Sequence, residues 1–319
     1  VVTVTGRLVG ADGAPVPGAR VSASVAEGFV ETGPDGGFAL SQVPVGSTSV
    51  RVVATAKSGG AEICAQAEVV PTRPGVLEMG DLIGTIMTDP PRTDLIGWWS
   101  GNAGLEDGAE TNALTSVGRQ RVGSGRIGTG LRLDGTTGYF TAKWSATGTL
   151  SNALSFAAWV RPEGLPGQQT IACQYDSRVL KDIGWYLGGD GGKLSLSLYE
   201  TGWGGRGHTI TTRDDVLVAG EWNWVAFSVD LSAGRVVLMV NGRAVALDEG
   251  ATLVPWTKFN VTTTPLLLGV LLGRNGAMGA PFRGDLDEVM LWRRALTDEE
   301  LAAVASRGCG LVVGGVGSE

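Results

Sequence analysis

The sequence predicts an all-β protein made of two β-sandwich domains, the second larger than the first, with one short helix near the carboxy terminus. A length of 319 residues exceeds what one small sandwich needs, so two domains are expected. The chain combines 51 glycines and 13 prolines with 43% hydrophobic residues, which is typical of a well-packed protein rich in turns. Apolar and polar residues alternate along many short runs, as they do in half-buried strands.

The charge of the chain excludes one class of partner. The formal net charge is −7, and nucleic-acid binding requires a basic surface, so we do not expect a nucleic-acid partner. No apolar run reaches the roughly 20 residues of a membrane-spanning helix, so we expect no membrane span. No signal peptide is recognisable and the chain opens at Val1 in a strand-like pattern, so we expect Val1 to be a mature, processed terminus or one cut to resemble it.

Residues 1–87 are expected to form the first domain, in which strand-like runs are separated by turn pairs. Three motifs follow one another: Gly6-Arg7-Leu8, Asp12-Gly13-Ala14-Pro15-Val16-Pro17-Gly18-Ala19-Arg20-Val21 and Asp35-Gly36-Gly37-Phe38. This order resembles the carboxypeptidase-regulatory-like (transthyretin-like) domain, a small Greek-key sandwich. The resemblance implies a spacer, stalk or interaction module, and the scattered acids of this domain indicate no chemistry.

The two ends of the chain suggest a route to self-assembly. The strand-like run from Val2 to Val9 lies at the terminus, and an exposed terminal strand can leave its sheet to pair with a neighbouring chain. A glycine-rich tail, residues 309–319, ends the sequence. These segments motivate one interpretation of function: a structural subunit of an extracellular fibre, appendage or surface layer, present as a homo-oligomer or filament.

Residues 88–93 form the predicted linker, because Pro90 and Pro91 hold the backbone extended and cannot join a ladder. The second domain is expected over residues 94–308. Strand motifs follow one another along it: Leu131-Arg132-Leu133-Asp134-Gly135, Leu154 to Pro162, the leucine–serine alternation from Lys193 to Leu198, Gly220-Glu221-Trp222-Asn223-Trp224-Val225-Ala226, and the type I′ hairpin dipeptide Asn241-Gly242.

A strand followed by a short helix closes this domain. Residues 289–292 alternate as a half-buried strand would, and Thr297 with Glu300 forms the pattern of a capping box. With the motifs before it, the stretch from Arg283 to Leu301 resembles the end of a laminin-G-like, concanavalin-A-like jelly roll. The resemblance covers most of the second domain and implies a large sandwich with recognition functions.

The ten tryptophans are numerous for this length. Five match core positions of the family and are expected to pack: Trp98, Trp99, Trp159, Trp222 and Trp292. Trp203 lies on a glycine-flanked loop beside Arg206 and His208, and exposed indoles bind the apolar face of sugar rings. With Trp185 these residues are the candidate glycan site. The alternative is that the indoles cover the sheet and that His208 is an ordinary solvent-exposed loop residue.

The resemblance also implies a structural calcium ion, which in many such jelly rolls joins the first loop to the closing strand. Calcium prefers oxygen ligands on turns. The matching residues are Asn102, Glu106 and Asp107 in the first loop and Asp287 in the closing strand. The alternative is that Asp287 caps a turn through its own backbone.

Catalysis and disulfide bonding are the remaining questions. Glycoside hydrolases need two converging carboxylates, and the sole candidate pair is Asp285 with Asp287. The enzymes of this fold use a Glu-x-Asp-x-x-Glu strand that the chain lacks, so we rank a hydrolase last. In a secreted protein Cys173 and Cys309 could bridge the jelly roll to its tail, with Cys64 buried or free; three reduced, buried thiols are the alternative.

The function expected from these features is non-catalytic recognition or adhesion at the cell surface or outside the cell. The partner would be a glycan or a cell-surface protein, with calcium as a structural ion. The fibre subunit is the second interpretation, and the glycoside hydrolase the third.

Overall fold

The computed structural model contains two compact units, which are described separately. The first unit comprises Val1–Pro90, Val122–Gly130 and the chain from Arg307 onward. The second comprises Pro91–Arg121 and Leu131–Ser306. The structure describes all residues except 26–27, 47–48, 59–60, 103, 110–111, 119, 137, 144–151, 176–182, 200–206, 249–263, 274–276 and 309–319.

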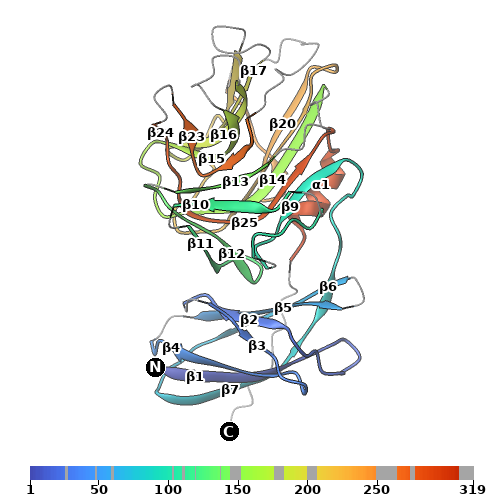
Figure 1. Cartoon of the computed structure of the whole chain (residues 1–319), viewed down its shortest axis with the longest axis vertical. Helices are drawn as coiled ribbons and strands as arrows, with labels where there is room; N and C mark the ends of the chain where they lie inside the picture. Colours follow the sequence, from blue (N-terminus) through green and yellow to red (C-terminus); the bar gives the residue numbers. More distant parts are fainter. Residues whose placement is uncertain are drawn as a thin grey trace. The chain divides into compact units, whose positions relative to one another are not determined.

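The first unit is a β-sandwich (Figure 1). Among the described residues, one sheet has the order β4-β1-β7 and the other the order β3-β2-β5-β6-β8. The strands are β1 (Val2–Val9), β2 (Arg20–Ala23), β3 (Val30–Glu31), β4 (Gly37–Val43), β5 (Val50–Ser58), β6 (Ala61–Val69), β7 (Gly75–Ile83) and β8 (Thr85–Met87). Valines and leucines of both sheets fill the space between them, with Val4, Leu8 and Val52 fully buried. The predicted small sandwich is confirmed.

β1 is the middle strand of its sheet. It pairs antiparallel with β4 on one side and parallel with β7 on the other. Val2, Val4 and Leu8 are buried in the core of the unit. The expectation of an exposed terminal strand is therefore wrong, because both edges of β1 are already paired and its apolar side chains are packed. The glycine-rich tail lies outside the described residues.

Residues 122–130, which the sequence analysis placed in the second domain, complete one side of the five-stranded sheet. Ile127 is fully buried against three side chains of this sheet: Val53, Cys64 and Met87. The Ser22 hydroxyl donates to the carbonyl of Gly128 at 3.3 Å, and Arg51 Nη2 donates to the carbonyl of Gly125 at 2.9 Å. This segment therefore contributes both apolar surface and hydrogen bonds to the first unit.

In the described part of the chain, the second unit is a larger sandwich of two sheets with one short helix (Figure 1). Among the described residues, one sheet has the order β10-β13-β22-β15-β16-β17-β18. Its strands are β10 (Leu114–Val117), β13 (Tyr139–Ala142), β15 (Gln168–Tyr175), β16 (Ile183–Asp190), β17 (Lys193–Tyr199), β18 (Gly207–Thr211) and β22 (Leu266–Leu268). A separate two-stranded ladder joins β23 (Leu271–Leu272) and β24 (Met278–Gly279).

The other sheet has eight strands in the described part of the chain, in the order β11-β12-β25-β14-β19-β20-β21, with β9 paired to β25. Its strands are β9 (Leu95–Trp99), β11 (Arg121–Ser124), β12 (Thr129–Asp134), β14 (Ala153–Pro162), β19 (Asn223–Asp230), β20 (Arg235–Val240), β21 (Arg243–Ala244) and β25 (Arg283–Trp292). The two sheets enclose the main hydrophobic core. The predicted jelly-roll sandwich is confirmed.

Two local predictions in this unit are confirmed. The leucines of β17, for example Leu196, are fully buried in the core, while Ser195 and Ser197 point to the other face. Asn241 and Gly242 join β20 to β21 with φ values of 50° and 77°, which a type I′ turn requires. Both features follow from local sequence, because strand alternation and turn type depend on adjacent residues.

The helix α1 (Asp298–Ala305) packs on the outer face of the eight-stranded sheet. Its buried residues Leu301 and Val304 belong to one apolar cluster with Met290 and Trp292 of β25. The Thr297 hydroxyl accepts the N–H of Glu300, whose carboxylate accepts the N–H of Thr297. The predicted capping box is confirmed.

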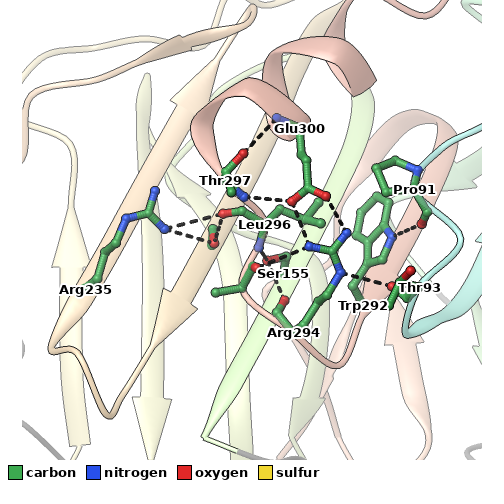
Figure 2. A network of polar contacts seen from close by, with 11 residues as sticks. Pro91, Thr93, Ser155, Arg235, Trp292, Arg294, Leu296, Thr297 and Glu300 are labelled. Carbon is green, nitrogen blue, oxygen red and sulfur yellow. Dashed lines mark hydrogen bonds and ion pairs between the residues drawn. The ribbon is translucent and has the colours of Figure 1, made fainter.

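Arg294 connects the helix to the chain that precedes β9 (Figure 2). Its guanidinium donates to both carboxylate oxygens of Glu300, at 2.7 and 2.6 Å, and its Nε donates to the carbonyl of Thr93 at 3.0 Å. Close by, the indole N–H of Trp292 donates to the carbonyl of Pro91 at 2.7 Å. These contacts join the helix and the end of β25 to the first residues of the second unit.

We expect Glu300→Gln to lower the stability of the second unit at neutral pH but not in acid. Hydrogen bonds from Arg294 hold the pKa of Glu300 below its usual value, despite the opposing effect of burial. A carboxylate with a lowered folded pKa stabilises the protein above its unfolded pKa, and this stabilisation is lost as the pH falls through the folded pKa. The loss should be about 1–2 kcal/mol at neutral pH.

Urea unfolding followed by tryptophan fluorescence measures this difference at neutral pH and at several pH values well below the usual glutamate pKa of about 4.3. Glu221→Gln, at an exposed position, is the matched control and should behave as the wild type at both pH values. A gap between wild type and Glu300→Gln that does not narrow in acid would contradict the prediction.

Candidate functional site

All four tyrosines of the chain lie on the outer face of the seven-stranded sheet. Their neighbours along each strand point into the core, so the alternation of a strand turns the tyrosines outward. Serine and threonine hydroxyls of β17 and β18 share this surface. We call it the tyrosine face, and it consists of Tyr139, Tyr175, Tyr186, Tyr199, Ser195, Ser197, Thr209 and Thr211.

Tyr175 and Tyr199 form an aromatic pair. Their ring centroids are 6.0 Å apart and their planes meet at 66°, an edge-to-face arrangement. The two residues come from β15 and β17, which flank β16. Neighbouring strands lie about 4.8 Å apart, so the rings reach toward each other across β16. Gly184 of β16 lies on this face, because the next residue, Trp185, points into the core. Gly184 has no side chain to separate the two rings.

Tyr186 lies flat on the same strand. A Cβ atom added at Gly188 would lie 2.1 Å from the Tyr186 hydroxyl oxygen, so this glycine provides the space that the ring occupies. The hydroxyl donates to the carbonyl of Gln169 at 3.0 Å. Burial raises the pKa of Tyr186, and it raises the pKa of Tyr175 and Tyr199 as well. Tyr175, Tyr186 and Tyr199 are therefore uncharged at neutral pH.

Hydroxyl groups form a ladder beside the rings. Ser195 with Thr211, and Ser197 with Thr209, make hydrogen bonds of 2.9 Å between β17 and β18. Each hydroxyl can donate one hydrogen bond and accept two, so capacity for a ligand is left on every member of the ladder. The tyrosine face therefore combines aromatic rings with uncharged hydrogen-bonding groups.

Two members of the predicted glycan site lie outside the described residues: Trp203 and Arg206. They belong to the segment 200–206 that connects β17 to β18. The residues on either side of this segment, Tyr199 and Gly207, are opposite each other in the sheet. The sequence candidate thus adjoins the tyrosine face along the chain.

The other two predicted members lie elsewhere than expected. His208 is in β18 rather than in a loop, opposite Leu198, and is half-buried. Trp185 is fully buried, its indole N–H donates to Gln174 at 2.9 Å, and its ring meets that of Phe227 edge-to-face at 5.4 Å. The prediction of Trp185 as a sugar platform is wrong, because strand alternation directs it into the core.

Tyr175 and Tyr199 were not among the residues predicted for the glycan site. A signal for Tyr199 was present, since it continues the outward series of serines in β17. Nothing local indicated that Tyr175, on another strand, would meet it. That contact depends on the strand order β15-β16-β17.

The predicted calcium ligands in the first loop have other contacts. The Asp107 carboxylate accepts three backbone N–H groups, those of Trp98, Ala109 and Asn112, at 2.7, 2.8 and 3.0 Å. This carboxylate therefore shapes the first loop directly. Asn102 is half-buried and Glu106 is exposed.

Asp287, the predicted ligand in the closing strand, is fully buried. Its Oδ1 accepts the N–H of Glu288 at 2.8 Å, within β25 at the point where the register against β14 shifts and Glu288 has a φ of 48°. The described residues contain no group of three or more histidine, cysteine, aspartate or glutamate side chains placed to hold a metal ion. Calcium binding stays a prediction.

The cysteines pair differently from the expectation. Cys173 is a buried free thiol that donates to the carbonyl of Val270 at 3.3 Å, whereas Cys64 is disulfide-bonded. A Cys173–Cys309 bridge is therefore wrong, because β15 places Cys173 in an apolar cluster under Tyr186. Cys309 itself lies outside the described residues.

These features define a class of protein: two β-sandwich units, of which the larger is a jelly roll with an aromatic sheet face. The concanavalin A-like lectin/glucanases superfamily matches residues 134–302, which is more than half of the chain. The chain therefore belongs to this superfamily. The carboxypeptidase regulatory-like domain matches residues 3–68, so both resemblances and their order are confirmed. No curated protein matches the chain significantly.

Solved structures share the fold of the larger unit. The botulinum neurotoxin serotype G binding domain is 14% identical, with a TM-score of 0.53 over 66% of this chain and 50% of that chain. The serotype D ligand binding domain in complex with N-acetylneuraminic acid is 11% identical, with a TM-score of 0.52 over 67% and 51%. The chain thus spans about half the length of these neurotoxin domains.

A third similar structure is domain 4 of AbnA, a GH43 extracellular arabinanase from Geobacillus stearothermophilus, in complex with arabinotriose. It is 23% identical, with a TM-score of 0.47 over 67% of this chain and 98% of that chain. Within the described residues of the present chain, no helix is long and apolar enough to cross a membrane.

Proposed function

We propose that the second unit recognises a glycan, without cleaving it, through the tyrosine face. The observation that carries this proposal is the Tyr175–Tyr199 pair beside the hydroxyl ladder. Aromatic rings pack against the apolar faces of sugars, and fixed hydroxyls meet the sugar hydroxyls, which is the usual composition of a small-molecule site. The rings and hydroxyls that define this face are uncharged, so we propose a neutral oligosaccharide as the ligand.

The comparisons are consistent with binding rather than with a particular ligand. The neurotoxin structures are described as binding domains, and one of them contains N-acetylneuraminic acid. Their identities of 14% and 11% support the shared fold alone. The glycan and its chemistry are therefore proposed from the tyrosine face.

We propose that the glycan is not cleaved because the two candidate carboxylates, Asp285 and Asp287, are buried. A glycoside hydrolase places two carboxyl groups about 5–9.5 Å apart on either side of the scissile bond. Asp285 Oδ2 accepts hydrogen bonds from Arg132 and Arg161, and the side chain is 3% exposed. Asp287 is fully buried. Neither carboxylate is placed to meet a substrate.

An extracellular or cell-surface location is part of the proposal. The disulfide at Cys64 supports it, because structural disulfides persist mainly in oxidising compartments. Recognition outside the cell also agrees with a module that carries a regulatory-like sandwich before its jelly roll. We infer an adhesion or recognition role there, with a glycan as the partner.

A glycan array followed by calorimetry tests the proposed function. We expect wild type to bind neutral oligosaccharides and Tyr175→Ala and Tyr199→Ala each to weaken binding about tenfold, which corresponds to 1.4 kcal/mol. Tyr199→Phe keeps the ring and should bind almost as wild type does. Phe29→Ala, an exposed aromatic of the first unit, is the matched control and should change nothing.

Two results would overturn the proposal: no neutral glycan retained by the wild type, or equal binding by wild type and both alanine variants. If the wild type retained a cell-surface protein that carries no glycan, the function would be protein recognition instead. Release of shorter sugars from a bound oligosaccharide would contradict the non-catalytic assignment.

A further inference from the structure

Charged side chains form a row on the outer face of the eight-stranded sheet, on the side of that sheet opposite the core. Arg132 of β12 and Arg161 of β14 are both in register with Asp285 of β25, which lies between them. Their neighbours along the strands, such as Leu133 and Val160, point into the core. The row therefore results from strand alternation and register together.

The row continues into an aromatic ring. Trp222 immediately precedes β19, whose first residue Asn223 is opposite Val160. The guanidinium carbon of Arg161 lies 5.0 Å from the centre of the Trp222 ring, within the range of a cation–π contact. Trp222 was expected to pack in the core, but it is only partly buried.

The arginines of this cluster are oriented by two acids. Asp285 Oδ2 accepts from Arg132 Nη1 at 2.8 Å and from Arg161 Nε and Nη2 at 3.0 and 2.9 Å. Glu163 accepts from Arg132 and, at 2.5 Å, from Nε of Arg283. Arg283 thus uses only its Nε, which leaves both terminal amino groups of its guanidinium fork available. Its side chain is 65% exposed.

The cluster has hydrogen-bond donors to spare. Each guanidinium carries five N–H groups, and the bonds to Asp285 and Glu163 use only one or two of them per arginine. The indole N–H of Trp222 is buried and finds no acceptor among the described residues. Asp134, which is opposite Arg283, already accepts the N–H of Thr136 at 2.8 Å. A ligand oxygen placed beside this buried donor would satisfy it.

We propose that this cluster is a second ligand site, for the carboxylate of an acidic sugar. The open fork of Arg283 matches a carboxylate in a bidentate geometry, and Glu163 holds that fork in place. Arg132, 39% exposed, adds a second cation beside it, and the Trp222 ring supplies an apolar surface. The site is independent of the tyrosine face, which lies on the other sheet and is proposed for neutral sugars.

Calorimetry with trigalacturonate, and with its methyl ester as the neutral match, tests this site. We expect the acid to bind and the ester to bind at least about tenfold more weakly, and sodium chloride to weaken binding of the acid. Arg283→Gln should weaken binding of the acid about tenfold. Arg243→Gln, an exposed arginine of β21 in the same sheet with the same change of charge, should leave it unchanged.

Glu163→Gln separates a ligand site from a purely structural ion-pair network. Glutamine keeps an oxygen that can accept from Arg283 but removes the negative charge that competes with the ligand. Binding of the acid should therefore strengthen, whereas a structural network would only lose stability. Equal effects of Arg283→Gln and Arg243→Gln, or no binding of trigalacturonate by the wild type, would overturn the proposal. Tyr175→Ala should not alter binding of the acid, so failure of this site and failure of the tyrosine face are distinguishable.

Discussion

Replacing Ile127 by aspartate is expected to unfold the first unit while the second unit stays folded. Ile127 has no exposed surface and packs against Val53, Cys64 and Met87. A carboxylate at this position would be buried without a partner, and the apolar contacts would be lost as well. Such changes cost about 3–5 kcal/mol, which is a large part of the stability of a small sandwich.

The two units can be followed separately because every tryptophan lies beyond residue 90. Hydrogen exchange of β5 and β6 should accelerate in Ile127→Asp, while the unfolding transition seen by tryptophan fluorescence stays as in the wild type. Ile86→Asp makes the same substitution at a position that is 72% exposed, and it should cost within about 0.5 kcal/mol of zero. Unchanged protection of β5 and β6 in Ile127→Asp would show that residues 122–130 do not stabilise the first unit.

Removing the disulfide at Cys64 is expected to give the second largest loss of stability. Cys64 is fully buried in β6, and the described end of the chain approaches this strand. Arg307 Nε donates to the carbonyl of Thr88 at 2.6 Å, and its Nη2 is 3.7 Å from the carboxylate of Glu62. Cys64→Ser should lower the stability of the first unit by about 2–4 kcal/mol, because the open chain gains conformational freedom.

Non-reducing peptide mapping identifies the partner. Since the chain has three cysteines and Cys173 is a free thiol, we expect Cys64 to be recovered linked to Cys309. Adding dithiothreitol should lower the melting temperature of wild type and of Cys173→Ala by the same amount, and should have no effect on Cys64→Ser. Recovery of Cys64 alkylated without prior reduction would contradict the prediction.

Features that depend on neighbours in sequence were predictable. The alternation in β17 determines which side chains point inward, and Thr297 with Glu300 determines where α1 begins. The same alternation places Arg132 and Arg161 away from the core. In each case the interacting groups are a few residues apart, so a spacing in the sequence specifies the contact.

Features that depend on strand order were not predictable. Trp185 and His208 were grouped with Trp203 because they are near in sequence, whereas the ring that meets Tyr199 belongs to Tyr175, two strands away in the sheet. The proposed Cys173–Cys309 pair failed for a similar reason, since a free thiol and a disulfide-bonded cysteine look alike in one sequence.

The sequence by itself determined that this protein is a pair of β-sandwiches, a regulatory-like one and a jelly roll closed by a capped helix. Only the tertiary structure decided that the tyrosines share one sheet face, that Arg132, Asp285 and Arg161 form a row, and that residues 122–130 belong to the first unit. The physical reason is that strand pairing joins residues more than a hundred positions apart, and no local pattern records which strands become neighbours.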